Sequence, residues 1–461
     1  MFTNLQINCL QNVSWLRKWT TQFTPARISS QCGFDKRCGA KPTELLRDLI
    51  ALAFIDTPLY LLTGNERPNR SVYYEFLGKG EHNWSKFIYL VATPLIAFLT
   101  ELTSSKQKKV LIVDDSSIKR NRSKKVDYLG HQFDHTDKTY FRGFRMLNLC
   151  WSDGHSLIPL EFELLTNANP KKRFGPDPVY QPEHAIAKRI ASSTQKATSL
   201  IVSMVKNALS KHIKADYLVF DSWFSHAKTL LQLAPLIPVV CVVKKNPKQL
   251  YKLGKRIFTA NGLYRHAVVG RKHFVQHSWG RLQCQKVQML NGPTVKLLFI
   301  TDVENRKNWT VIASTDMSLS AEEIAQIYAK RWHIEEFFKN AKQHLGMQHE
   351  CESRKFAVLI AHLSIVLLRY MMLEFANRQE KDEKTIPGIF RAHKEELQAL
   401  AVLTCIQIIL FEVTQLLKTD NPTLNITQLC QKYAQLDPTQ FNLSHESVNL
   451  FFKIVIQKVC L

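Results

Sequence analysis

Residues 320–346 read SAEEIAQIYAKRWHIEEFFKNAKQHLG, and the apolar residues recur at helical intervals. A capping box marks the start, with Ser320 at the cap and Glu323 three residues later. The glycine at position 346 is typical of a residue that follows the last turn of a helix. The spacing therefore predicts one continuous amphipathic helix between Ser320 and Gly346.

One face of this predicted helix carries a narrow stripe of polar side chains. At about 100° per residue, four of them fall within an arc of about 60°, namely Tyr328, Arg331, Glu335 and Lys342. The neighbouring acid, Glu336, points about 80° away from Tyr328 and off this polar stripe. A solvated helix surface with ordinary charge pairs would look similar, so the stripe alone does not establish a site.

The charge balance of the chain is strongly basic. Lys and Arg number 62 against 39 Asp and Glu, which leaves a formal net charge of +23 spread along 461 residues. A polyanionic partner explains this excess, with nucleic acid first and an anionic membrane surface second. A merely basic soluble protein is the remaining interpretation. The length predicts roughly two to four structural units.

Cysteine usage and the apolar segments indicate a reducing cytoplasm. The ten cysteines show no pair at the two-residue spacing of zinc or redox sites. The N-terminus is polar and lacks a signal peptide. The longest apolar run, residues 356–375, contains His362, Arg369 and Glu374, which favours a core helix over a membrane span.

The order of apolar patterns predicts a mixed α/β sheet. Apolar runs at 110–113 and 217–220 predict buried strands that end in acids. An Asp-Gly pair at 153–154, between two apolar runs, predicts a hairpin. The other predictions are helices up to about residue 105, helices over 183–209, a strand over 238–243, a mostly β insertion over 250–313 and helices over 353–461.

Carboxylates follow two of the predicted strands, and a further carboxylate lies on the polar stripe. Asp114 and Asp115 follow one predicted strand, Asp221 follows another, and Glu335 lies on the polar stripe. Acids at strand ends are common, but three of them in so basic a chain favour a magnesium site, because Mg²⁺ prefers hard oxygen ligands. Two such ions about 3.5–4 Å apart can serve phosphodiester chemistry.

The other members of the polar stripe suit phosphate. Arg331 and Lys342 would hold phosphate oxygens beside Glu335, and Tyr328 would donate a hydrogen bond. No second histidine follows His333 at the spacing of a zinc-protease helix. The sequence also lacks a glycine-rich phosphate loop, so ATP dependence is not expected.

The polar stripe carries a resemblance to a known family. Its order of Tyr, two residues, Arg, three residues, Glu, six residues and Lys is similar to the signature of bacterial insertion-sequence transposases of family four. Those proteins belong to the class with an Asp-Asp-Glu triad on a ribonuclease-H-like fold. The motifs at 113–117 and 220–224 resemble the first two acidic motifs of the family. The resemblance covers residues 107–350, whereas the two ends match only in being helical.

The resemblance implies a ribonuclease-H-like α/β mixed sheet core that a β-rich insertion interrupts and helical regions flank. The implied regions are a helical DNA-binding region at 1–105, the first part of the catalytic core at 106–249, the β-rich insertion at 250–313, the signature helix of the core at 314–350, and a C-terminal helical region for DNA contacts or dimerisation at 351–461.

The resemblance also implies a metal-ligand set of Asp115, Asp221 and Glu335 for two Mg²⁺ ions, with Mn²⁺ as a substitute. Asp115 is preferred to Asp114 because the first acid of the family directly precedes a small hydroxyl residue, here Ser116. Adjacent residues of a strand face opposite sides, so only one of the two acids is expected in the site.

Some members of the family use a tryptophan of the insertion to hold a flipped base. Trp309 lies at a suitable distance before Glu335, and Trp279 is a second candidate. For either tryptophan, packing in the core or against a hairpin is the alternative role.

The predicted function is cut-and-paste DNA transposition. Metal-activated water would hydrolyse the phosphodiester at terminal inverted repeats, and the freed 3′ hydroxyl would attack target DNA. The resemblance implies a hairpin intermediate and a homodimer that bridges two ends, in a bacterial, cytoplasmic and nucleoid-associated protein. One alternative is a ribonuclease-H-like nuclease without strand transfer. Another is a catalytically inactive transposase relative that only binds DNA.

Overall fold

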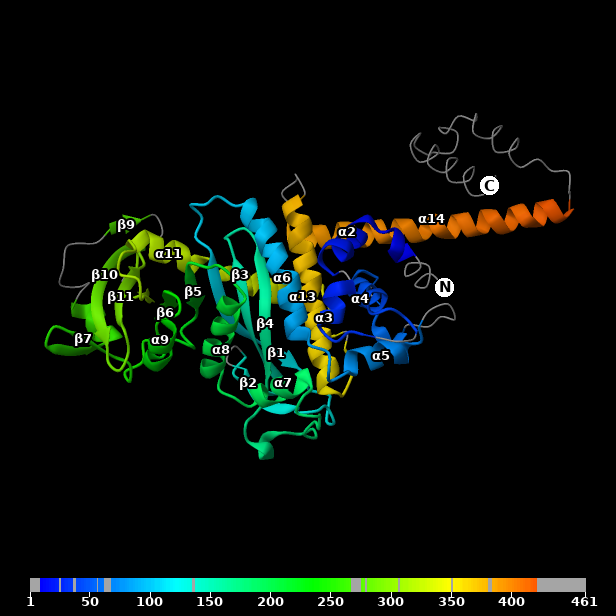
Figure 1. The fold of residues 1–461 in the computed structure, drawn as a ribbon. Helices are drawn as coiled ribbons and strands as arrows, with labels where there is room; N and C mark the ends of the chain where they lie inside the picture. The colour runs from blue at the N-terminus through cyan, green and yellow to red at the C-terminus, as the bar shows by residue number, and fades with distance from the viewer. Residues whose placement is uncertain are drawn as a thin grey trace.

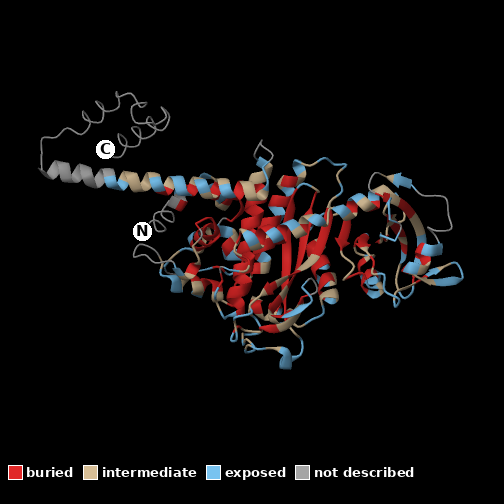
Figure 2. Ribbon diagram, turned by 180° about the vertical axis from the view of Figure 1, so that it is seen from behind, coloured by how far each residue is buried: buried red, intermediate tan, exposed pale blue. Residues whose placement is uncertain are grey.

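A β-sheet runs through the middle of the protein, in a computed structural model that describes residues 9–24, 26–35, 39–55, 57–61, 68–134, 137–266, 275–277, 280–305, 307–349, 351–379 and 384–420. Helices from both ends of the chain lie on one side of the sheet, and the β-rich residues 250–314 lie at the opposite end (Figure 1). The buried residues concentrate where helices and sheet meet (Figure 2).

Five strands form the centre of the sheet in the order β4–β3–β1–β5–β6. They are β1 (Val110–Lys119), β3 (Thr139–Ser152), β4 (Leu157–Leu165), β5 (Tyr217–Phe220) and β6 (Val239–Val242). β1, β5 and β6 are parallel, whereas β3 is antiparallel to both β1 and β4. β2 (Gly130–Asp134) pairs with the outer part of β3. This arrangement confirms the predicted mixed α/β sheet.

The strand at β1 extends further than its apolar pattern indicates. Residues 110–113 have no solvent exposure, as expected for a strand buried on both faces. The prediction that this strand ends in its two acids was wrong. β3 pairs with β1 from Val110↔Ser152 to Lys119↔Gly143, so hydrogen bonding carries the strand beyond the acids. The acids therefore lie in the middle of a strand, and both are half-buried.

The predicted hairpin is confirmed as β3 and β4. The Asp153 carboxylate accepts hydrogen bonds from the backbone N–H groups of His155 and Ser156 at 2.9 and 2.8 Å. Gly154 has φ of +95°, a conformation that glycine adopts without a Cβ clash. The chain then forms α7 (Ala185–Ser193) and α8 (Ala197–Ser210), so the predicted helical stretch is two helices, and α9 (Ala227–Leu233) connects β5 to β6.

Helices from distant parts of the chain cover the sheet. α6 (Trp84–Glu101) and α13 (Phe356–Gln379) contact each other and β4, and α12 (Trp332–Gln343) contacts β1. Of the described residues, only those of α13 form a helix long and apolar enough to span a membrane. Every residue from Phe356 to Phe375 is buried within the fold, which confirms the predicted core helix.

Further described helices lie toward the N- and C-terminal ends of the chain. They are α2 (Ser14–Phe23), α3 (Ala26–Gln31), α4 (Pro42–Ala51), α5 (Arg70–Gly78) and α14 (Ile386–Asp420). α14 projects away from the body of the protein (Figure 1). Residues 1–8 and 421–461, which belong to the predicted terminal helical regions, lie outside the described residues.

The β-rich residues extend the central sheet. β12 pairs antiparallel with β6, which places all these strands in one sheet of twelve strands. The elements are β7 (Leu250–Leu253), β8 (Arg256–Thr259), α10 (Ala260–Tyr264), β9 (Val275–His277), β10 (Gly280–Met289), β11 (Thr294–Thr301) and β12 (Trp309–Ser314).

Residues 320–346, the signature segment, form two helices, so the prediction of one continuous helix was wrong. α11 (Ala321–Ala329) ends before Lys330, and α12 begins after Arg331. Around the break the backbone makes three-residue hydrogen bonds, as from Arg331 N to the carbonyl of Tyr328 at 3.0 Å. The predicted capping box at Ser320 is confirmed, because both of its reciprocal bonds are present.

Candidate active site

The arginine at the helix break joins two of the candidate acids. Arg331 donates one hydrogen bond to Asp114 at 3.1 Å and another to Glu335 at 2.5 Å. Asp114 comes from the middle of β1, and Glu335 comes from the first turn of α12, which packs on that strand. One guanidinium thus binds two carboxylates, one of which lies 217 residues before the arginine in the chain.

Asp115 lies on the other face of β1. Its carboxylate accepts two hydrogen bonds from Arg145 of β3, each at 2.7 Å. Adjacent strand residues face opposite sides, so the contact of Asp114 with Arg331 directs Asp115 away from α12. The structure therefore places Asp114, and not Asp115, beside Glu335. The choice of Asp115 as ligand rests on the resemblance alone and stays a prediction.

Asp221 stands immediately after β5, where the parallel strand ends. The register pairs Val113 of β1 with Phe220 of β5. Asp114 and Asp221 each come directly after this pair, so the two acids lie at neighbouring positions along the two adjacent strands. The carboxylate of Asp221 accepts a hydrogen bond from the backbone N–H of Trp223 at 2.8 Å, which fixes it at this edge of the sheet. Tertiary structure thus brings the second predicted acid to the first strand.

The electrostatics of the acids reflect their crowding. Burial, together with the charges of Asp115 and Asp221, raises the pKa of Asp114 to about 7. Burial also raises the pKa of Asp221, and the charge of Asp115 acts in the same direction. Arg331 and Lys244 partly oppose the rise at Asp221. Half-buried carboxylates whose charges repel one another are stabilised by a cation.

Arg331 supplies that positive charge in the described arrangement. Although burial opposes its charged form, neighbouring Tyr328, Glu335 and Asp114 raise the pKa of Arg331 above its ordinary value. No three His, Cys, Asp or Glu side chains in the described part of the chain lie close enough to ligate one ion together. The oxygen donors nevertheless suit a hard divalent cation, because Asp114 and Glu335 already bind one positive group and the charge of that group also acts on Asp221.

The polar stripe is divided along α11 and α12. Tyr328 lies near the carboxylates, with its ring centroid 5.7 Å from the Arg331 guanidinium, and burial raises its pKa to about 12. Lys342 lies seven residues beyond Glu335, roughly 10 Å along a helix. Burial lowers the pKa of Lys342, and its electrostatic neighbours are Lys119 and Asp134 rather than the candidate acids. Lys342 would therefore hold a different phosphate group of the DNA from the phosphate that would lie beside Glu335.

The ring of Trp309 contacts two neighbouring side chains, Tyr264 and Lys245. Its ring stacks on Tyr264 with a centroid distance of 4.2 Å and an interplanar angle of 1°. The Lys245 ammonium lies 4.0 Å from its centroid and bonds its backbone carbonyl. The structure describes packing contacts for Trp309, whose role in holding a flipped base stays a prediction, and Trp279 lies outside the described residues.

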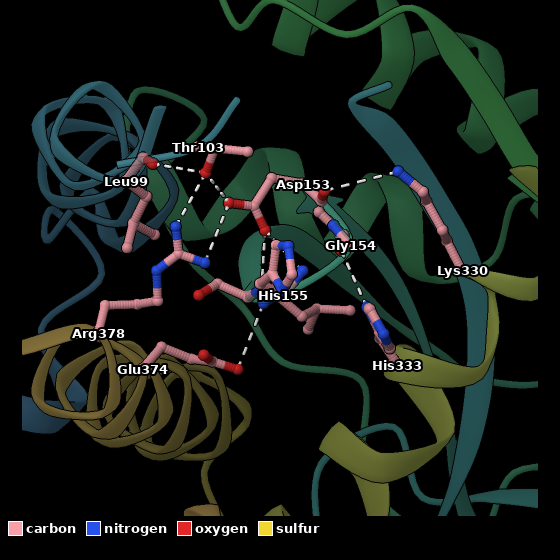
Figure 3. Close-up of polar contacts among 12 residues, drawn as sticks. Leu99, Thr103, Asp153, Gly154, His155, Lys330, His333, Glu374 and Arg378 are labelled. Atoms are coloured by element: carbon pink, nitrogen blue, oxygen red, sulfur yellow. Dashed lines mark hydrogen bonds and ion pairs between the residues drawn. The ribbon is translucent and has the colours of Figure 1, made fainter. Parts of the chain in front are cut away.

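A polar network fixes the start of α12 to the hairpin turn (Figure 3). His333 Nδ1 lies 3.0 Å from the hydroxyl of Ser152, and Lys330 contacts the backbone carbonyl of Asp153 at 3.5 Å. The fully buried carboxylate of Asp153 pairs in turn with Arg378 of α13 at 3.4 Å. These contacts flank the helix break and hold Arg331 and the first turn of α12, which carries Glu335, next to β1.

Neither Arg145 nor this network was predicted from the sequence. Arg145 is a lone charge in the apolar stretch Phe144–Cys150, and that interruption was the available signal. The ring of Trp223 lies close to two cations. Its centroid is 3.8 Å from the Lys244 ammonium and 5.8 Å from the Arg145 guanidinium. These cations lie near Asp221, where they add positive potential to the edge of the sheet.

Two family models match the chain over this site. Residues 183–372 match a model described as a transposase DDE domain, and residues 56–258 match one described as a DDE superfamily endonuclease. The two matches support a DDE transposase family. The first description agrees with the predicted transposase class and the second names an endonuclease, whereas the assignment to family four stays a prediction.

The two matched ranges together contain all four acids described above. No curated protein matches the chain. A similar solved structure is the cryo-EM structure of the piggyBac transposase synaptic complex with hairpin DNA. The similarity has a TM-score of 0.39 and 12% identity, and it covers 85% of this chain and 82% of that one.

Proposed function

We propose that the protein is a metal-dependent DNA transposase that cuts at terminal inverted repeats and joins the freed ends to target DNA. The observation that carries the proposal is that Arg331 binds both Asp114 and Glu335, while Asp221 lies close enough to interact electrostatically with Asp114 and Arg331. The family descriptions support the reaction class. A net charge of +23 supports a nucleic acid as the substrate.

A ribonuclease-H-like core is part of this proposal. Its support is the central sheet, in which the antiparallel β3–β4 hairpin adjoins β1 and the parallel strands β5 and β6 follow on the other side. The acids lie on β1, after β5 and on a later helix, which is the order that the family resemblance implies.

The proposed ligands of the metal are Glu335, Asp221 and one acid of β1. The geometry supports Asp114 as that acid, because its carboxylate shares a guanidinium with Glu335. When bound, Mg²⁺ or Mn²⁺ supplies an activated water and stabilises charge on the leaving oxygen. Arg331 would then turn its planar fork to phosphate, which it binds in the same bidentate manner as carboxylate.

The proposed partners are the inverted repeats, the target DNA and a second copy of the chain. Residues 1–105, with help from the β-rich insertion and the C-terminal region, would read the repeats, and a dimer would hold two ends together. The proposed location is the bacterial cytoplasm, at the nucleoid. A nuclease without strand transfer and an inactive DNA-binding relative are the rival functions.

The test uses DNA that carries the repeats flanking the gene for this chain. With Mg²⁺, the purified protein is expected to cut at the repeat termini and to join the ends to a plasmid, as read on a denaturing gel. EDTA is expected to abolish both products and Mn²⁺ to restore them. Cutting without end preference or joining would favour the nuclease. Binding to the ends without cutting under any metal would favour the inactive relative.

A second test separates the two acids of β1. Asp114→Asn is expected to lower the cleavage rate by about 10³-fold, the equivalent of several kcal/mol of metal-dependent stabilisation. Asp115→Asn is expected to lower the cleavage rate about tenfold at most. Asp115 pairs with Arg145 on the other face of the strand, so its charge influences the site only from a distance. Single-turnover cleavage measures both rates. The reverse order would show that Asp115 is the ligand, as the resemblance implies.

A further inference from the structure

A buried asparagine lies directly opposite Asp114 in the sheet. Asn148 of β3 pairs in register with Asp114 of β1, and Asn148 has no solvent exposure. Directly opposed residues of antiparallel strands point to the same face, with Cβ atoms roughly 4.5–5.5 Å apart. Asn148 is therefore an immediate neighbour of the candidate acid, on the face that α12 covers.

The carboxamide of Asn148 has no partner among the described residues. Neither Nδ2 nor Oδ1 makes a hydrogen bond, although both atoms are buried. Leaving a buried polar group unpaired costs about 1–3 kcal/mol. The residues before and after it in β3, Leu147 and Leu149, are fully buried and apolar, and Cys150 follows on the same face. An apolar side chain would suit this position better if packing were its only task.

The chemistry of the pair indicates what the amide would do. An asparagine Nδ2 carries two donors, and an ionised carboxylate has about four acceptor sites. Asp114 at present uses its oxygens for Arg331 and for the backbone N–H of Asp115, at 3.1 and 2.8 Å. When Arg331 turns to phosphate, Asp114 loses its side-chain partner, and the Asn148 amide is a donor directly opposite it in the strand pair.

We propose that Asn148 is a positioning residue, which donates from Nδ2 to the Asp114 carboxylate when the site holds a divalent cation. The inference rests on the proposed function, because it assigns a task to Asn148 only if Asp114 is a ligand. A hydrogen bond of this kind fixes the orientation of a ligating carboxylate, and its loss typically weakens metal binding about 10–100-fold.

The test measures Mn²⁺ binding by electron paramagnetic resonance, without DNA and independently of cleavage. Asn148→Leu is expected to weaken Mn²⁺ binding by about 10–100-fold. The midpoint of thermal unfolding of the Asn148→Leu protein is expected not to fall, because the substitution removes an unpaired buried amide and keeps a similar side-chain volume. Cys150→Ala, a change on the same face of β3, is the matched control and is expected to bind Mn²⁺ as the parent does.

Asn148→Ala serves the same purpose if the leucine does not pack, and it is expected to show the same loss of Mn²⁺ affinity. Unchanged Mn²⁺ affinity in a folded Asn148 variant would overturn the positioning role and leave the transposase proposal intact. Equal losses in the Cys150→Ala control would also overturn it, since they would indicate a general disturbance of the strand. Absence of Mn²⁺ binding by the parent protein would overturn both proposals.

Discussion

Glu335→Gln is expected to abolish cleavage at the repeat termini, with a loss of at least about 10³-fold in rate. Glutamine keeps the shape of the side chain but removes the negative charge that a divalent cation requires. The change also removes one ionic partner of Arg331, which bonds Glu335 at 2.5 Å and Asp114 of β1 at 3.1 Å. Single-turnover cleavage with Mg²⁺ measures the effect.

Two controls make this result specific. Glu336→Gln removes the adjacent acid, which is exposed and lies off the polar stripe, and it is expected to cleave at close to the parent rate. Binding to repeat DNA, measured by a mobility shift, is expected to persist in Glu335→Gln, since a carboxylate does not attract phosphate. Cleavage by Glu335→Gln at the parent rate would contradict the site.

Arg369→Met is expected to destabilise the fold by about 3–5 kcal/mol. Arg369 of α13 has no solvent exposure and donates to the backbone carbonyls of Ile50, Leu49 and Leu345, at 3.0, 2.5 and 2.7 Å. Two of these carbonyls belong to the last turn of α4, which has no intrahelical donors for them, and the third follows α12. Methionine fills much of the space but leaves all three carbonyls unpaired in the interior.

The measurement is the midpoint of thermal or urea unfolding, followed by circular dichroism. Arg391→Met removes an exposed arginine of α14 and is the matched control, which is expected to leave the midpoint nearly unchanged. An Arg369→Met protein with the parent midpoint would show that α4, α12 and α13 do not depend on this side chain for their association.

Local patterns in the sequence were sufficient for much of the secondary structure. The apolar runs at β1 and β5, the Asp-Gly turn between β3 and β4, and the capping box at Ser320 all depend on residues within a few positions of one another. Alternation, helical spacing and turn chemistry act over that range, so these predictions were confirmed. The buried α13 follows from its composition in the same way.

The ends and interruptions of elements were harder to predict. β1 continues past its acids because β3 supplies hydrogen-bond partners as far as Lys119, and no local pattern records the length of a partner strand. The signature segment breaks at Lys330 and Arg331, and the side chains of Lys330 and His333 contact the hairpin. Helical periodicity cannot register a contact with residues almost two hundred positions away.

The sequence by itself determined the mixed α/β class, the buried strands and the residue types of the proposed phosphodiester-cleaving site, because each depends on local spacing and on composition. Only the tertiary structure decided which acid of β1 faces Glu335, that Arg331 joins them, and that Asn148 lies opposite. Those relations depend on strand register and on the face that α12 covers. A register shift of one residue would exchange the two faces and leave every local pattern unchanged.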